Sequence, residues 1–548
     1  MTDKNYSRSA VRYLILAVLT SFLVVLNIKL RWEDGDEGRY VVLAQAVAQG
    51  AGQTNIQLPE PTPEGIVPPG YLYALAGTMK LAGLDNIVAL FWLSAIFYVV
   101  FVLLYHAWLR REEGLHDAMK WCVFLIGGFS VFNLSYGWRI HTEAMYFATT
   151  AAALFFSAVH ATKGGLAFAA CVGIATAVSA LTRPVGIVLI PAVTGYMLLQ
   201  RRWRDAACCV VMIVVCYLPT VFRSYDIFGV PIAYLSMYGE KQGAGLADTI
   251  KTVFVFLPYY FFDALPRHMF YYLFDGDCLL CKAGIGFLAK PACYAMAVLI
   301  AVGFFSRLRK PTAVELYWAL YWPLISTFNQ PNYISRGIHL FQERYVLPMI
   351  PLAAWYLGLG ISVVSGVLFQ RNPARARAVS PTLMAGMAAY VMVTAVAAGW
   401  VRTKKEMELA GQHPWSPARH FVTGDYYDST WARYVEAALW IGSNTPPDSV
   451  VVCRHSFHLY LMAGRKSVRY DGVEIPNQDA WQIIEGQAKF GPVYVIQDAF
   501  PEKSGYGYDR VTMLDPVLHG AKDRFELAFQ TPEPVTKVWK LRVSPPNG

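Results

Sequence analysis

Residues 13–40, YLILAVLTSFLVVLNIKLRWEDGDEGRY, decide the fold of this chain. The first part, residues 13–30, is almost entirely apolar and long enough to cross a bilayer, which takes roughly 20 residues. The second part places Asp34, Asp36 and Glu37 directly after this run. Carboxylates at the edge of the hydrocarbon are costly, so they mark a site more often than a solvated loop that merely ends a helix. The segment therefore predicts a membrane protein with chemistry at one membrane face.

The composition of the whole chain agrees with this class. Of its 548 residues, 55% are hydrophobic and only 16% are charged, whereas soluble domains carry about 25% charged residues. The formal net charge of +9 comes largely from short basic loops between apolar runs. Such loops fix the orientation of membrane proteins, so the charge does not predict a nucleic-acid partner.

The apolar runs predict about eleven membrane spans of this length. Basic residues precede the first run and follow the second, fourth, sixth, eighth and tenth runs, so they all fall on one side. Cytoplasmic loops are rich in Lys and Arg, which places the N-terminus in the cytoplasm and the C-terminal tail outside it. The first run lacks a small-residue cleavage site, and we expect an uncleaved anchor. The predicted spans cover residues 13–30, 87–109, 119–136, 143–160, 165–181, 185–199, 206–222, 291–305, 314–328, 345–368 and 383–400.

The sequence divides into a predicted transmembrane domain, residues 1–400, and an exterior C-terminal domain, residues 401–548. The tail has more charged residues, and its apolar runs are shorter and are interrupted by Pro and Gly. This pattern predicts strands that alternate with short helices. The predicted fold class is a polytopic α-helical membrane protein with a C-terminal exterior α/β domain. The expected tail strands are 449–453, 466–470 and 492–496, and the expected tail helices are 430–443, 458–463 and 481–490.

Two features between the seventh and eighth spans do not fit a simple span. The aromatic-rich pieces 253–262 and 269–274 are too short to cross a bilayer, and they predict interfacial or re-entrant helices. Cys278 and Cys281 lie in the same exterior loop, whereas most other cysteines lie in predicted spans. A local disulfide and a reduced pair are equally consistent with this spacing.

Charged residues from separate loops converge on the exterior face in this topology. Arginines bind phosphate oxygens through paired hydrogen bonds, and carboxylates transfer protons, so both signs of charge at the bilayer edge suit a lipid phosphate. Taken singly, Arg139 or His141 is better explained as a snorkelling or capping charge. The converging residues are Asp36 and Glu37, then Arg139, His141 and Glu143, then Arg183, and finally Arg336, His339, Glu343 and Arg344.

Several short segments, in order along the chain, resemble the GT-C glycosyltransferases, most closely the branch of dolichyl-phosphate-mannose mannosyltransferases and aminoarabinose transferases. The chain departs from the aminoarabinose transferases at residues 66–69, Ile-Val-Pro-Pro, where those enzymes carry a lysine. This departure leaves the sugar and the acceptor open. The similar segments are residues 36–40 (DEGRY), 68–71 (PPGY), 141–143 (HTE), 182–186 (TRPVG), 343–348 (ERYVLP) and 440–465.

The resemblance implies an enzyme that moves a sugar from a polyprenyl-phosphate donor to a lipid, glycan or protein acceptor outside the cytoplasm, with inversion. Its setting would be the bacterial inner membrane, within the cell envelope. A divalent metal at Asp36 and Glu143 is allowed but not required. The implied roles are catalysis for Asp36, as base, and Glu37; binding of the donor phosphate for Arg39, Arg183 and Arg344; and substrate positioning for Tyr40, His141, Glu143 and Tyr345.

Three other functions are weighed against this one. A transporter or a flippase for a glycolipid would place charges inside the spans and show internal repeats with broken helices. A membrane scaffold would not need the pair of Asp36 and Glu37. An O-antigen-ligase-like enzyme need not carry carboxylates directly after its first span.

Overall fold

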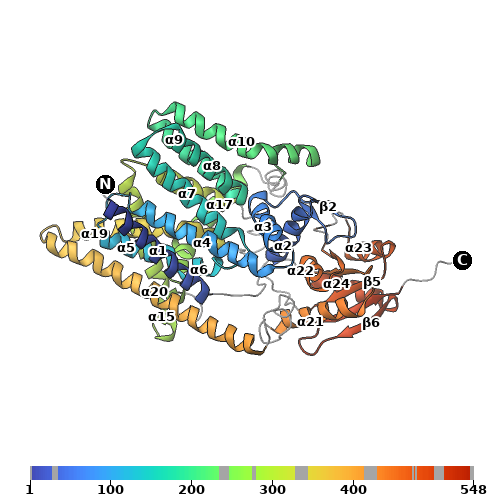
Figure 1. Ribbon diagram of the computed structural model, residues 1–548. Coiled ribbons are helices and arrows are strands. Elements are labelled where there is room, and N and C mark those ends of the chain that lie inside the picture. The colour runs from blue at the N-terminus through green and yellow to red at the C-terminus, as the bar shows by residue number, and fades with distance from the viewer. Residues whose placement is uncertain are drawn as a thin grey trace.

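A helical bundle carries a smaller β-sheet domain at one end, and the N-terminus lies at the opposite end of the bundle (Figure 1). The computed structural model describes residues 3–27, 35–233, 246–274, 279–327, 343–412, 429–471, 474, 478–498 and 511–542. Within these residues, six helices are long and apolar enough to cross a membrane, and three shorter apolar helices accompany them. The chain is therefore built as an integral membrane protein.

Helices occupy the positions of all the predicted spans, although the number that cross a membrane is not fixed by this agreement. The bundle helices are α1 (Asp3–Leu26), α4 (Ile87–Leu109), α5 (Asp117–Phe129), α6 (Val131–Tyr136), α7 (Thr142–Lys163), α8 (Leu166–Thr182), η1 (Pro184–Val188), α9 (Leu189–Leu199), α10 (Trp203–Phe228), α16 (Ala289–Arg307), α17 (Ala313–Thr327), η4 (Glu343–Met349), α19 (Ile350–Leu368) and α20 (Pro373–Gln412).

The expected single span at residues 119–136 is wrong, because it is two helices. Ser130 has extended backbone angles between α5 and α6, and its hydroxyl accepts a hydrogen bond from the Asn133 amide at 3.3 Å. A serine that caps a helix in this way ends the helix before it. Helix α20 also continues to Gln412, beyond the residue at which the tail was expected to begin.

The centre of the bundle is held by a close contact between α16 and α19. A Cβ atom added to Gly303 would lie 1.9 Å from the Tyr356 carbonyl oxygen, and one added to Gly360 would lie 1.9 Å from that of Leu299. Small residues let two membrane helices approach with their backbones in contact. Helix α19 is consequently enclosed on almost all sides.

Residues 246–274 and 279–288 form short helices, and the expected short pieces 253–262 and 269–274 lie in them. Phe256 and Tyr260 are buried in the main core, so this region packs into the bundle as well as bordering it. Cys281 is disulfide-bonded, and Cys278 lies outside the described residues. The helices are α12 (Leu246–Pro258), η2 (Tyr259–Ala264), α13 (Leu265–Met269), α14 (Tyr271–Phe274), α15 (Leu279–Lys282) and η3 (Gly286–Leu288).

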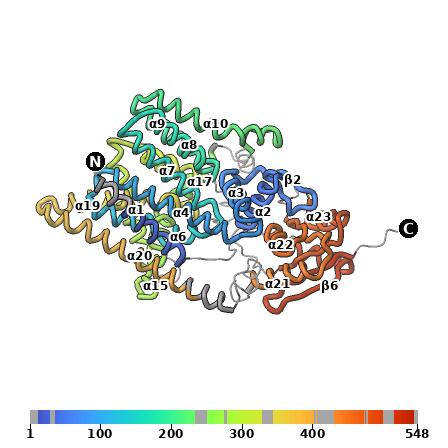
Figure 2. The backbone as a smooth tube through the Cα atoms, viewed as in Figure 1, coloured from blue at the N-terminus to red at the C-terminus, as the bar shows by residue number. Residues whose placement is uncertain are grey.

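The segment of residues 35–86 caps the end of the bundle nearest the sheet domain (Figure 2). It contains α2 (Gly35–Ala48), the short strands β1 (Thr54–Asn55) and β2 (Thr62–Pro63), and α3 (Pro69–Ala82). At Gly70, an added Cβ would lie 2.9 Å from the Leu181 carbonyl oxygen, so α3 sits tightly on the end of α8. This contact places α2 next to the junction of α8 and η1.

The C-terminal domain is an α/β unit, as predicted, with sheet order β4-β3-β5-β7-β6. Strand β3 (Val450–Cys453) is parallel to β4 (Lys466–Arg469) and β5 (Val493–Gln497), whereas β7 (Lys537–Leu541) is antiparallel to β5 and to β6 (Phe525–Gln530). Alternate β3 residues face two separate cores, as in a three-layer domain. The helices are α21 (Ser429–Asn444), α22 (Ser456–Ala463), α23 (Ala480–Gly486), η5 (Gln487–Lys489), α24 (Val511–Gly520) and η6 (Lys522–Arg524).

Candidate active site

The acidic motif forms the first turn of helix α2. Asp36 and Glu37 both lie in this turn, where the positive end of the helix dipole favours a carboxylate. Asp34 lies outside the described residues. Helix α2 packs against α3 and against α22 of the C-terminal domain, and these contacts position its first turn.

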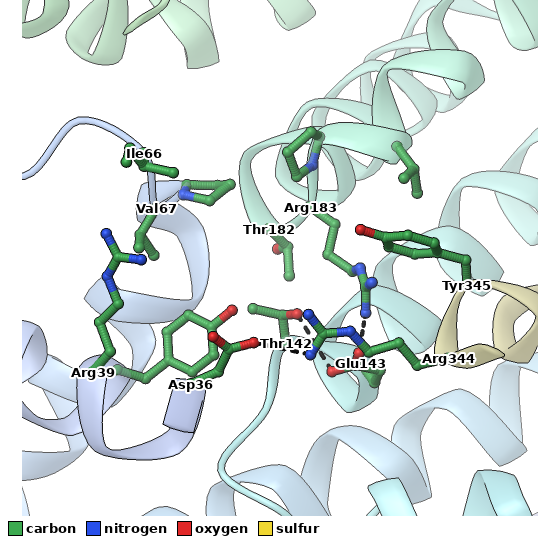
Figure 3. Close-up of a pocket in the computed structure, with 14 residues that line it drawn as sticks. Asp36, Arg39, Ile66, Val67, Thr142, Glu143, Thr182, Arg183, Arg344 and Tyr345 are labelled. Atoms are coloured by element: carbon green, nitrogen blue, oxygen red, sulfur yellow. Dashed lines mark hydrogen bonds and ion pairs between the residues drawn. The ribbon is translucent and has the colours of Figure 1, made fainter. Parts of the chain in front are cut away.

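A cavity of about 150 Å³ opens beside this turn. Its walls come from α2, from the segment before α3, from the start of α7, from the junction of α8 and η1, and from η4 (Figure 3). These five segments are distant in sequence and meet only in the folded chain. The predicted site residues that line the cavity are Asp36, Arg39, Tyr40, Glu143, Arg183, Arg344 and Tyr345.

Two ion pairs organise the charges around the cavity. Arg344 donates from Nη1 to Asp36 Oδ2 at 2.9 Å, and Arg183 donates to Glu143 (Figure 3). Burial opposes ionisation of Asp36, but the combined attraction of Arg344, His141 and Arg39 outweighs it and holds the pKa of this carboxyl below its usual value. Asp36 is therefore an anion at neutral pH.

The Arg183 guanidinium is held by aromatic rings as well as by its carboxylate. Its Cζ lies 5.8 Å from the Tyr146 ring centroid and 5.7 Å from that of Tyr345. Cations prefer such positions over aromatic faces. The predicted positioning residue Tyr345 thus contacts an arginine at the cavity wall.

His141 and Glu37 lie behind the cavity wall. His141 Nε2 is 3.8 Å from Glu37 Oε1, and His141 Nδ1 is 3.6 Å from Glu143 Oε2. Glu37 is fully buried and does not line the cavity. Tyr40 packs edge-on against His141 with ring centroids 6.1 Å apart. Glu37 and His141 thus connect α2 to the start of α7 beneath the charged surface.

Arg39 points along the edge of the cavity toward the segment between α2 and α3. Its Nη2 donates to Glu64 Oε2 at 2.5 Å, and Glu64 also accepts a hydrogen bond from the Ile66 amide. Burial opposes ionisation of Glu64, but Arg39 and these hydrogen bonds hold its pKa below the usual value. Of the three arginines predicted to bind phosphate, Arg183 and Arg344 lie together at the inner end, and Arg39 lies apart.

The C-terminal domain contacts the helix that carries the carboxylates, through side chains that the sequence did not single out. The His458 ring on α22 lies about 3 Å from the position of a Cβ added to Gly38, and the Phe457 ring centroid lies 5.8 Å from Arg39 Cζ. Burial lowers the pKa of His458 to about 4, so its imidazole is neutral. The Ser467 amide also donates to the Gln57 carbonyl oxygen at 2.8 Å.

Asp36 and Glu143, predicted as metal ligands, each face an arginine. Within the described residues, no group of three or more His, Cys, Asp or Glu side chains is arranged to hold a metal ion. The guanidinium groups of Arg344 and Arg183 would repel a metal ion held by these carboxylates. The site therefore suits an anionic ligand better than a metal cation. A divalent metal here stays a prediction.

Comparisons with known proteins bear on the fold. No family model and no curated protein matches the sequence. The structure is similar to that of the oligosaccharyltransferase of Archaeoglobus fulgidus tethered to an acceptor peptide, at 15% identity and a TM-score of 0.55, covering 98% of this chain and 75% of that one. It is also similar to ArnT from Cupriavidus metallidurans, at 14% identity and a TM-score of 0.51, covering 98% of both chains.

This chain has the GT-C fold. Both similar structures are GT-C membrane glycosyltransferases, and the likeness extends over the bundle and the C-terminal domain. The resemblance read from the short sequence motifs is therefore confirmed at the level of the fold.

Proposed function

We propose that the protein is a membrane glycosyltransferase of the GT-C type, which transfers a sugar from a polyprenyl-phosphate carrier to an acceptor on the extracytoplasmic face. The observation that carries this proposal is the cavity in which Asp36 pairs with Arg344 and Glu143 pairs with Arg183. Arg183 and Arg344 can bind a phosphate, and the partly exposed Asp36 carboxylate can accept a proton. The GT-C fold supports the same chemistry.

In the proposed reaction, an acceptor hydroxyl or amide attacks the anomeric carbon from the side opposite the phosphate. Its proton passes to Asp36. The bond between the anomeric carbon and the phosphate oxygen breaks, and its electron pair stays on the phosphate. The transition state resembles an oxocarbenium ion, as in glycoside hydrolysis. The leaving group is already a phosphate anion, so no general acid is needed.

In this proposal Arg344 can donate hydrogen bonds either to Asp36 or to the donor phosphate. In the structure it donates to Asp36. A donor phosphate, with more acceptor oxygens and more charge, replaces Asp36 as its partner and leaves the carboxylate free to take the proton. Arg183 adds a second charge-assisted contact, already oriented by Glu143 and Tyr345. Donor binding and activation of the base are then one event.

The remaining predicted residues have supporting roles in the proposal. Glu37 and His141 hold α2 against α7 and thereby fix the direction of Asp36. Arg39, fixed by Glu64, borders the entrance used by the acceptor. The C-terminal domain rests on α2 through α22 and contributes to the choice of acceptor.

The test uses membranes that contain the full chain and a radiolabelled polyprenyl-phosphate sugar. Asp36→Asn keeps the size of the side chain but removes the base, so transfer is expected to fall about 100- to 10,000-fold. Donor binding is expected to persist, because both inner arginines remain. Glu60→Gln is the control, since Glu60 is exposed and pairs with exposed Lys489. Full transfer by Asp36→Asn would refute the assignment of the base.

A further inference from the structure

A second cavity, of about 540 Å³, lies at the end of the bundle away from the candidate active site. Helix α7 joins the two, because Glu143 in its first turn lines the first cavity and Ser157 near its other end lines the second. At 1.5 Å per residue, these positions are about 20 Å apart along the helix. The second cavity therefore lies near the opposite membrane face, where α4 and α16 end in basic residues.

An ion network of one arginine and two glutamates lies at the inner wall of this cavity, which Arg307 and Glu112 line. Arg307 donates to Glu112 at 3.1 Å and to Glu315 at 3.4 Å. Glu315 also accepts hydrogen bonds from the Tyr356 hydroxyl and from Thr312. A charge held by this many partners is not available to a ligand, so the network serves as a rigid wall.

The rim of the cavity has a different character. Arg111, Lys310 and Glu113 line it and are exposed, and neither of the two cations forms an ion pair with any other residue in the described part of the chain. The Arg111 guanidinium lies 5.4 Å from the Phe155 ring centroid, which keeps it at the rim. Cations in this position at a membrane face attract phosphate groups of lipids.

Two buried polar atoms of the cavity wall need a partner. Ser157 is 2% exposed, and its Oγ forms no hydrogen bond within the described residues. Gln200 donates to the Tyr196 hydroxyl at 2.7 Å, but its buried Oε1 accepts no hydrogen bond from them. Buried polar atoms are almost always paired, with protein or with a bound molecule. Gln200 Oε1 specifically requires a hydrogen-bond donor.

The cavity is also open to the lipid side. Leu154 and Ala158 form its apolar wall on α7, and Leu199 at its edge is 65% exposed. An exposed leucine at the end of a membrane helix is in the position of a lipid contact. A bound molecule can therefore have a polar part inside the cavity and an apolar part among the membrane lipids.

We propose that this cavity binds the headgroup of a glycerophospholipid from the leaflet opposite to the candidate active site. The phosphodiester contacts Arg111 and Lys310, and the terminal group of the head donates a hydrogen bond to Gln200 Oε1 and accepts one from Ser157 when it carries a hydroxyl. Phosphatidylglycerol and phosphatidylethanolamine both supply such a donor. Phosphatidylcholine has the same phosphodiester but no donor, because its nitrogen is fully methylated. The site is structural and does not depend on the proposed transfer reaction.

The experiment adds each of the three lipids to the purified full chain in detergent and records retained lipid by native mass spectrometry and the Tm. Phosphatidylglycerol and phosphatidylethanolamine are expected to remain bound as one molecule per chain and to raise the Tm, and phosphatidylcholine to do neither. Retention of phosphatidylglycerol alone would also support the site and assign it to the anionic lipid. Equal retention of all three lipids would overturn the proposal, since it indicates nonspecific contact.

Variants locate the binding. The double substitution Arg111→Gln with Lys310→Gln removes only exposed charges, and we expect about a tenfold loss of lipid affinity. The matched control is Arg371→Gln with Arg377→Gln, two exposed arginines just before and near the start of helix α20 that do not line the cavity. Ala161→Leu fills the cavity without changing its charge and is expected to reduce retention as well. Unchanged retention in both cavity variants would place the lipid elsewhere and refute the proposal.

Discussion

Arginines and carboxylates gather near both ends of helix α7, but they are paired differently at the two ends. Near the C-terminal domain, each carboxylate has its own arginine, and Asp36 and Arg344 are 38% and 24% exposed. At the other end, one arginine is shared by Glu112 and Glu315, and Glu315 is 1% exposed. The Asp36–Arg344 pair is therefore accessible to water and to ligands, whereas the Glu315 side chain is not.

This contrast shows that buried ion pairs near a membrane have more than one use. A shared arginine enclosed by carboxylates and hydroxyls holds helix ends together. A one-to-one pair with exposed atoms is held less tightly, because water and ligands compete for it. The pairing pattern, rather than the presence of charge, separates the candidate active site from the structural network.

The largest effect is expected from removing the shared arginine. Arg307→Ala leaves Glu112 and Glu315 close together without a cation, and breaking a buried pair costs about 3–5 kcal/mol. The Tm in detergent should fall strongly, whereas transfer per folded molecule should be unchanged. Arg344→Ala is the counterpart, with little change in Tm and a large loss of transfer. If the folded fraction of Arg307→Ala has lost transfer activity, the distinction between a structural network and a candidate active site is wrong.

A pH effect of similar size is expected where the C-terminal domain meets α2. His458 is neutral in the folded chain, with its pKa lowered by burial to about 4, whereas the unfolded chain binds a proton near pH 6.5. Stability should therefore be unaffected above pH 6.5 and fall on the order of 3 kcal/mol as the pH drops to 4. Thermal unfolding between pH 4 and 7 measures it. His458→Gln should flatten this slope, and an unchanged slope would show that another group titrates.

The sequence was a good guide to features that depend on local pattern. Apolar runs predicted the positions of the bundle helices, because membrane helices satisfy their backbone groups internally and need only length and apolarity. The break at Ser130 was missed because its side chain caps a helix inside an otherwise apolar run. Strands β6 and β7 were missed because only three of their eleven residues are buried, and because the pairing of β7 with β5 joins distant parts of the chain.

The candidate site was predicted as a set of residues but not as an arrangement. Family-like motifs brought Asp36, Glu143, Arg183 and Arg344 to attention, and all of them line one cavity. No motif indicated which arginine faces which carboxylate, since this depends on how distant segments meet. Glu64 and the α22 contacts were missed for the same reason.

A moderate effect is expected at the domain contact itself. An added methyl group at Gly38 would lie 2.9 Å from the His458 ring, so the ring or helix α2 must move. We expect Gly38→Ala to cost about 1–3 kcal/mol, as overpacked sites do. Gly77→Ala is the matched control in neighbouring α3, because an added Cβ there meets nothing within 4 Å. Equal Tm values for the two variants would show that α22 does not press on α2.

The smallest predicted effect is also the most specific to the proposed donor. Arg344→Lys keeps the charge beside Asp36 but loses the paired hydrogen bonds that a guanidinium makes with a phosphate. Stability should change by less than about 0.5 kcal/mol, because the pair is partly exposed and such pairs contribute little. Affinity for a polyprenyl phosphate, measured by competition with a labelled carrier, should fall about tenfold, which corresponds to about 1.4 kcal/mol. Arg39→Lys is the comparison, since Arg39 is bound to Glu64 at the cavity edge and should affect the carrier less. If Arg39→Lys weakens carrier binding and Arg344→Lys does not, the phosphate lies at the edge of the cavity, and the pair of Asp36 and Arg344 is structural like its counterpart at the other end of α7.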